Sequence, residues 1–246
     1  MKACRDPYPQ LIVDLDKLRE NLAAVIDRCH DSLVEVTGVV KGANALPEVA
    51  RVFAESGLKY LATSRLDQVR AMRAAGIETP MMLIRIPMRS ELPELVRLCD
   101  ASLVSDLGTL RALNDEAARQ GKVHRVMLMI DLGDLREGWW SAEELVDAAV
   151  EVERQLKSLH LLGVGVNLSC YGSVKPDKRN MQGLVSLAHD VEEAIGRELE
   201  YVSGGAYGPF AIFNWLMPIV NIVLAYLGLT VADMNNVRLA RKKAAK

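Results

Sequence analysis

The chain has 246 residues, half of them hydrophobic and a quarter charged, and its formal net charge at pH 7 is −2. This balance is typical of a globular protein and excludes the disordered and fibrous classes. The length suits one large α/β domain or two smaller domains. Nothing in the overall charge indicates a nucleic-acid partner.

The cysteines and histidines indicate neither a disulfide framework nor a metal site. The four cysteines lie far apart, with no pair at metal-ligand spacing, so we expect reduced thiols and no bound metal. We expect the four histidines on the surface or at helix ends. Charged residues interrupt every early apolar run, which argues against a signal peptide and favours a cytoplasmic protein. The residues concerned are Cys4, Cys29, Cys99, Cys170, His30, His124, His160 and His189.

Short apolar runs alternate with amphipathic stretches along the chain as far as the SGG triplet at 203–205. Strands are expected at 35–41, 60–64, 81–86, 101–105, 126–132, 161–167 and 200–203. Helices are expected at 15–29, 46–56, 65–75, 91–99, 107–120, 142–156 and 181–197.

The predicted strands are nearly continuous apolar runs, which is typical of parallel strands buried on both faces. Repeated strand–helix units favour a parallel sheet, either closed as a barrel or doubly wound. No GxGxxG follows the first predicted strand, which weakens the doubly wound, dinucleotide-binding alternative. We therefore predict an α/β fold, a TIM-like (β/α)8 barrel that is incomplete because seven parallel strands are recognisable.

The chain changes character after the seventh predicted strand. Residues 201–232 carry no charged side chain, and 210–231 is long enough to cross a bilayer as a helix. The basic cluster 241–243 follows, where the positive-inside rule would place it on the cytoplasmic side. We predict two parts, a barrel over 1–205 and a hydrophobic helix with a basic tail over 206–246. Two interpretations of that helix stay open, membrane association and a buried element packed on the barrel.

Lys41 ends the first predicted strand, where its side chain would face the barrel mouth. Barrel enzymes keep their active sites at this end, which is built from the carboxyl ends of the strands. A lysine there can lose its proton through desolvation and attack an aldehyde, forming a Schiff base. A solvated surface lysine is the simpler alternative for a residue at the end of a strand.

Two glycine-containing segments also fall at the ends of predicted strands. Ser203, Gly204 and Gly205 end the seventh strand, where glycines let backbone N–H groups approach a phosphate and the serine adds a hydroxyl donor. Residues 131–138 follow the fifth strand with the sequence DLGDLREG, and the fork of Arg136 could bind a carboxylate or a phenolate. An ordinary turn and a surface salt-bridge loop are the respective alternatives.

Further polar side chains are expected at the same mouth. Arg85 lies within the third apolar run, where burial of its charge would be costly unless the guanidinium were paired. The others are Ser64 and Arg65 after the second strand, and Asn167, Cys170 and Tyr171 after the sixth.

In this order, these segments resemble the alanine racemase N-terminal domain family, whose barrel of fold type III binds pyridoxal 5′-phosphate (PLP). The branch of alanine and ornithine racemases is the most similar. The likeness spans about residues 9–205, and its specificity comes from the motifs in combination. The segments are PQLIVDLDKLRENL (9–22), VTGVVK (36–41), SRLD (64–67), LIRIPM (83–88), DLGDLREG (131–138), GVNLSC (165–170) and SGG (203–205).

The resemblance implies that Lys41 carries PLP as a Schiff base and that Ser203 and Gly204 contact its phosphate. It implies Arg136 near the cofactor phenolate and the substrate carboxylate, and Asn167 near the pyridine ring. With PLP as the electron sink, the reaction is proton transfer at the substrate α-carbon, and Lys41 is the natural base on one face. The other residues expected to bind the cofactor are Ser64, Arg65, Arg85 and Gly205.

The chain departs from the family after Gly205. The family continues there with an eighth strand and a β domain, which in alanine racemase lends a tyrosine to the neighbouring subunit's site. The acid on the opposite face of the substrate is therefore unassigned, with Cys170 and Tyr171 as candidates. We expect a C-terminally truncated chain with a foreign apolar tail. A homodimer is one way to cover the exposed sheet edge.

Three functions compete on this basis. The first is a PLP-dependent racemase of a free amino acid, with alanine, ornithine, lysine and serine all open as substrates. The second is a PLP-binding barrel without turnover that serves vitamin B6 handling. The third is an inactive, truncated fusion product tethered to a membrane by 210–231.

Overall fold

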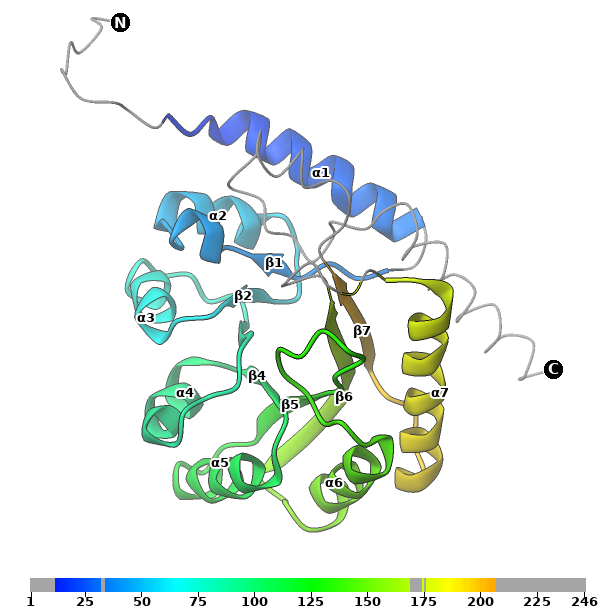
Figure 1. The fold of residues 1–246 in the computed structure, drawn as a ribbon. Helices are drawn as coiled ribbons and strands as arrows, with labels where there is room; N and C mark the ends of the chain where they lie inside the picture. The colour runs from blue at the N-terminus through cyan, green and yellow to red at the C-terminus, as the bar shows by residue number, and fades with distance from the viewer. Residues whose placement is uncertain (1–11, 32–33, 169–173, 175, 207–246) are drawn as a thin grey trace, which may run out of the picture.

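The structure, a computed structural model, describes residues 12–31, 34–168, 174 and 176–206. Within these residues, strands alternate with helices, and the helices lie around the outside of the strands (Figure 1). The strands are β1 (Gly38–Val39), β2 (Leu61–Thr63), β3 (Met81–Leu83), β4 (Ala101–Val104), β5 (His124–Met129), β6 (Leu159–Leu168) and β7 (Tyr201–Ala206). The α-helices are α1 (Leu15–Asp31), α2 (Pro47–Glu55), α3 (Leu66–Ala74), α4 (Leu92–Leu98), α5 (Leu107–Arg119), α6 (Ala142–Arg154) and α7 (Lys178–Ile195), and the short 3-10 turns are η1 (Lys41–Ala43) and η2 (Arg89–Glu91).

The seven strands form one parallel sheet, in which each strand pairs with the next in chain order. The sheet is curled, because residues that precede its first two strands lie beside its last strand. Lys59, just before β2, lies 5.7 Å from the ring centroid of Tyr201, the first residue of β7. The same ammonium lies 2.5 Å from a carboxylate oxygen of Glu35. The prediction of an incomplete TIM-like barrel with seven parallel strands is confirmed.

The two faces of the sheet bury different sets of side chains. Side chains alternate between the faces along each strand, and the apolar character of both sets shows that both faces are covered. The larger set packs against the surrounding helices, as Val104 and Leu128 illustrate. The smaller set fills the concave inside of the curled sheet: Val39, Tyr60, Ala62, Met82, Ala101, Leu103, Met127, Met129 and Leu162.

Side chains that cap the helices fix where the later helices begin. Asp106 accepts a hydrogen bond from the backbone N–H of Thr109 at 2.7 Å, at the start of α5. Ser141 does the same for Glu144 at the start of α6. Such caps satisfy N–H groups that the first helical turn leaves unbonded. The caps therefore fix the residues at which α5 and α6 begin.

The predicted C-terminal part is outside these residues. The structure describes Ala206 as the last residue of β7, and the remainder of 206–246, with the segment 210–231, is not among the described residues. The division of the chain at residue 205 therefore stays a prediction. None of the helices in the described ranges combines the length and the apolar character needed to cross a membrane.

Candidate functional site

Lys41 lies at the carboxyl end of β1, where the chain turns into η1. The backbone N–H of Val40 still bonds to Ala62 O at 3.0 Å, so the end of β1 stays in register with β2. Asn44 closes the turn in the left-handed region, with φ of 50°, and donates its N–H to Lys41 O at 3.0 Å. The Asn44 side chain accepts a bond from Gln68 at 2.8 Å. These contacts hold the backbone of Lys41 at the barrel mouth.

β6 and β7 bring Asn167 and Ser203 to the concave side of the sheet, with Asn167 near the end of β6 and Ser203 within β7. The prediction that the seventh strand ends at Ser203 is wrong, because β7 continues to Ala206 in register with β6. Gly165 pairs with Ser203 in the parallel ladder, and Asn167 pairs with Gly205. A Cβ placed on Gly165 would lie 3.1 Å from Ser203 Cβ and 3.2 Å from the sulfur of Met129, a residue of the concave core. The Ser203 side chain therefore points to the concave side, and Asn167, two residues after Gly165, shares that side.

The connection between β5 and α6 is a closed loop with a specific geometry. Its two ends are joined because Trp139 N bonds to Met129 O at 2.8 Å and Asp131 N bonds to Trp139 O at 2.9 Å. Asp131 is buried, and one of its oxygens accepts hydrogen bonds from Gly133 N at 2.7 Å and Leu135 N at 3.2 Å. Carboxylates commonly organise turns by bonding to the backbone a few residues ahead. The loop therefore presents its side chains from a defined backbone.

Arg136 and Asn167 meet at one carboxylate, that of Glu137. The Glu137 side chain is 9% exposed, and its Oε1 accepts a hydrogen bond from Asn167 Nδ2. The same oxygen lies 3.5 Å from Arg136 Nε. The geometry thus connects the loop after β5 with the end of β6.

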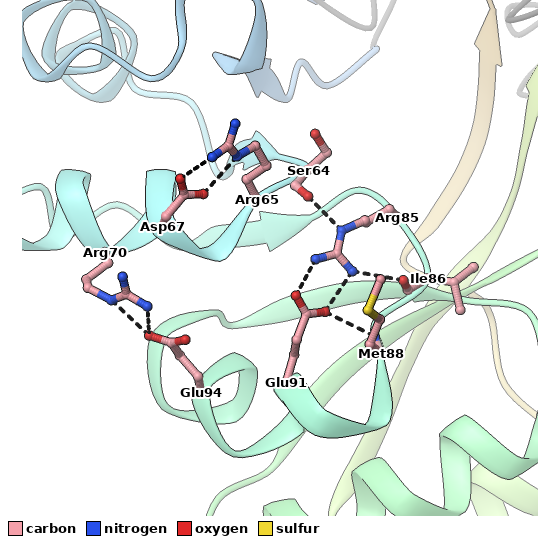
Figure 2. Close-up of polar contacts among 9 residues, drawn as sticks. All are labelled: Ser64, Arg65, Asp67, Arg70, Arg85, Ile86, Met88, Glu91 and Glu94. Atoms are coloured by element: carbon pink, nitrogen blue, oxygen red, sulfur yellow. Dashed lines mark hydrogen bonds and ion pairs between the residues drawn. The ribbon is translucent and has the colours of Figure 1, made fainter.

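Arg85 is held by a network that involves the connections after β2 and β3 (Figure 2). Its two terminal nitrogens bond to the two oxygens of Glu91, at 2.8 and 2.7 Å, and its Nε donates to Ser64 O at 2.7 Å. The Arg85 guanidinium holds the pKa of the Glu91 carboxyl below its usual value. The pairing that a charge in this apolar run requires is therefore present. The strand itself ends earlier than predicted, at Leu83.

Arg65 forms a more exposed pair at the start of α3. Its Nε and Nη2 bond to the two carboxylate oxygens of Asp67, and both side chains are at least half exposed (Figure 2). An exposed pair of this kind contributes little to stability. It keeps a cation beside Ser64, at the carboxyl end of β2.

The structure thus places most of the predicted site residues at one end of the sheet. Lys41, Ser64 and Asn167 lie at the carboxyl ends of three strands, and Ser203 lies within β7 with Gly204 and Gly205 after it. Arg65, Arg85 and Arg136 lie in the connections that follow β2, β3 and β5. Cys170 and Tyr171 lie outside the described residues, so the opposite-face acid stays a prediction. Two residues have roles that the sequence reasoning missed. They are Asp131, the acid that opens the loop before Gly133, and Glu137, the acid between Arg136 and Gly138.

Comparison with known proteins identifies relatives of this arrangement. The family model "Alanine racemase, N-terminal domain" matches residues 13–212. The chain is 36% identical over 198 residues to the ornithine racemase of Acetoanaerobium sticklandii, covering 80% of this chain and 55% of that protein. It is also 36% identical over 199 residues to the lysine racemase of Thermotoga maritima, covering 80% of this chain and 54% of the relative. The chain therefore spans about half the length of these relatives.

Solved structures show the same barrel. The alanine racemase from Streptomyces lavendulae superposes with a TM-score of 0.66 at 26% identity, over 77% of this chain and 50% of that one. A D-threonine aldolase from Filomicrobium marinum superposes with a TM-score of 0.69 at 24% identity, over 87% and 60% respectively, which bears on the fold alone. With a family match over most of its length and the fold in agreement, the chain belongs to the alanine racemase N-terminal domain family.

Proposed function

We propose that this chain provides the PLP-binding barrel of an amino-acid racemase. One observation carries the proposal: an amine, a hydroxyl, an amide and a guanidinium are gathered at one mouth. Lys41 follows β1, Asn167 and Ser203 share the concave side, and Arg136 comes from the closed loop after β5. Family membership supports the same assignment.

The residues present fit PLP by their chemistry. The cofactor needs an amine for its aldehyde, donors for its phosphate and polar partners for its ring substituents. Lys41 offers the amine, and the Ser203 hydroxyl beside Gly204 offers a donor where the chain carries no side chain to obstruct a phosphate. Gly165 leaves room next to Ser203, since a Cβ there would crowd Ser203 and Met129.

The catalytic roles follow from these positions. PLP, when bound, withdraws electrons from the substrate α-carbon and so makes its proton acidic. The Lys41 amine would take the proton from one face of the α-carbon, and a second acid, for which Cys170 and Tyr171 are the candidates, would return a proton to the opposite face. Arg136 binds the substrate carboxylate with its planar guanidinium fork. The loop that carries Arg136 has its two ends hydrogen-bonded to each other. The closed loop keeps the guanidinium in place as the substrate binds.

The substrate we propose is a basic amino acid, ornithine or lysine. The support is the 36% identity to relatives named ornithine and lysine racemase, compared with 30% for an alanine racemase from Treponema denticola. We propose a cytoplasmic location because Cys29 and Cys99, the cysteines among the described residues, are buried free thiols.

The test combines cofactor trapping with a racemisation assay. The full chain is incubated with PLP, treated with borohydride, digested, and mapped by mass spectrometry. We expect a phosphopyridoxyl group on Lys41, and none after Lys41→Ala, whereas the surface variant Lys157→Ala keeps the label. The loss of optical rotation is then measured in separate solutions of L-ornithine, L-lysine and L-alanine with the protein added.

Each outcome decides between the functions. A label on Lys41 with loss of rotation supports the racemase. A label without loss of rotation from any of the three amino acids would replace it with the non-catalytic PLP-binding barrel. An unlabelled Lys41 would refute both.

A further inference from the structure

Glu137 has no direct part in the proposed reaction. Its side chain lies beside Arg136 and Asn167, which do take part in the reaction. Its side chain is 9% exposed, whereas that of Arg136 is 29% exposed. A carboxylate removed from water in this way is costly unless it is paired and hydrogen-bonded. Both kinds of partner are present, because Oε1 accepts from Asn167 Nδ2 and lies 3.5 Å from Arg136 Nε.

The contacts of Glu137 differ in kind from those of Asp131 in the same loop. The Asp131 carboxylate bonds to backbone N–H groups of its own loop, those of Gly133 and Leu135, so it shapes the loop. The Glu137 carboxylate contacts side chains, and one of them belongs to β6. Because Asn167 donates its amide nitrogen to Glu137, the carbonyl end of that amide is turned away from Glu137.

We infer that Glu137 is a positioning residue, which holds Arg136 and Asn167 in one orientation at the barrel mouth. The inference rests on the proposed function. A negative charge at Oε1 attracts the guanidinium and fixes the direction of the Asn167 amide with the same atom. Without that charge, the Arg136 side chain can adopt more rotamers. Binding of a carboxylate must then order the side chain, which lowers the affinity. The effect of Glu137 therefore acts through Arg136.

A double-mutant cycle separates this role from a general effect on folding. Glu137→Gln keeps an oxygen that can accept from Asn167 but removes the charge, and Arg136→Met removes the guanidinium while keeping an unbranched apolar stem. Two unreactive ligands are compared by fluorescence titration of the full chain. N-(5′-phosphopyridoxyl)-L-alanine carries the substrate carboxylate, and pyridoxamine 5′-phosphate does not.

We expect Glu137→Gln to lower the affinity for the carboxylate-bearing ligand about tenfold and the affinity for pyridoxamine 5′-phosphate less than about twofold. Residues in contact, such as Arg136 and Glu137, are expected to have non-additive effects. In the Arg136→Met background, Glu137→Gln should change neither ligand by more than about twofold. Additive effects of the two substitutions would overturn the inference. If neither ligand bound the wild-type chain, the proposed function and the inference would fail together, whereas binding with additive effects would refute the inference alone.

Glu153→Gln is the matched control. Glu153 lies on α6 and pairs with Arg197 at 2.8 Å, with both side chains 29% exposed, so the substitution removes a half-buried charge away from the mouth. Thermal unfolding is recorded for every variant. An equal, carboxylate-selective loss in Glu153→Gln would assign the effect to stability and overturn the inference.

Discussion

Gly138 closes the loop that carries Arg136, and replacing it with alanine should break that closure. Its φ is +132°, a region that residues with a side chain rarely adopt. A Cβ built there would lie closer than 3.0 Å to Asp131 N and to the carbonyl carbon of Ile130, and 2.9 Å from Ile130 O. These are backbone atoms, and Asp131 N is itself hydrogen-bonded to Trp139 O, so no side-chain rotation relieves the clash.

The expected cost follows from two contributions. Holding alanine in an unfavourable backbone region costs about 1–3 kcal/mol. Forcing extra volume against a fixed backbone costs about 1–3 kcal/mol more. We therefore expect Gly138→Ala to lower the free energy of unfolding by about 4 kcal/mol. For a domain of this size, that corresponds to a fall in Tm of about 8–16 °C.

Two other glycines serve as controls in the same urea and thermal unfolding assays. Gly196 ends α7 with φ of +78° and has nothing within 4 Å of an added Cβ, so its alanine variant should lose about 1–2 kcal/mol. Gly183 lies within α7 in open space, and its alanine variant should gain about 0.5–1 kcal/mol. The affinity for PLP is measured alongside. A loss for Gly138→Ala no larger than that for Gly196→Ala, with PLP affinity unchanged, would refute the closed-loop argument.

Buried titratable groups yield two further predictions. Burial lowers the pKa of His124 from 6.5 to about 4, so protonation favours the unfolded state and stability is lost as the pH falls from 6.5 towards 4. That loss of unfolding free energy is about 3 kcal/mol. Urea unfolding at pH 7 and pH 4 should show a smaller pH dependence for His124→Gln than for the wild-type chain. An equal pH dependence in both proteins would contradict the prediction. Burial also raises the pKa of Cys29 to about 11 and that of Cys99 to about 12. Peptide mapping after iodoacetamide at pH 8 should find both unmodified in the folded chain and modified in urea, and rapid labelling of the folded chain would refute their burial.

The order of strands and helices is predictable from the sequence because each strand is buried on both faces and so reads as an apolar run. The boundaries of the strands are less predictable where a charged residue lies within an apolar run. The run 81–86 predicts a strand through Arg85, but the strand ends at Leu83 because Arg85 bonds to Glu91 in the following turn. No pattern in the run itself reveals a partner six residues ahead.

The prediction that the histidines lie on the surface or at helix ends is wrong for His124, which is buried. A histidine next to Lys122 and Arg125 suggests a surface position, yet His124 is 2% exposed and begins β5. Its Nε2 lies 3.0 Å from Ser102 Oγ, on the neighbouring strand β4. The partner that makes burial acceptable is 22 residues away in the chain, and only strand pairing reveals it.

The candidate site was predictable to a similar degree. The ends of parallel strands meet at one edge of a sheet, so Lys41, Asn167 and Ser203 can be expected together from their places in the pattern. The relation between Arg136 and Glu137 could not, because both lie in a loop, whose backbone conformation does not follow from the apolar pattern. The backbone there is irregular, since Leu135, just before the two residues, adopts a positive φ of 59°.

Arg85, one of the arginines expected near the cofactor, has its charge surrounded by partners from the protein itself. Arg85 donates to Ser64 O, to Ile86 O and to both oxygens of Glu91, all between 2.7 and 3.1 Å. A ligand anion would have to displace a two-point ion pair to reach it, at a cost that such a pair makes large. We therefore expect Arg85 to brace the ends of β2 and β3 rather than to bind a ligand anion directly.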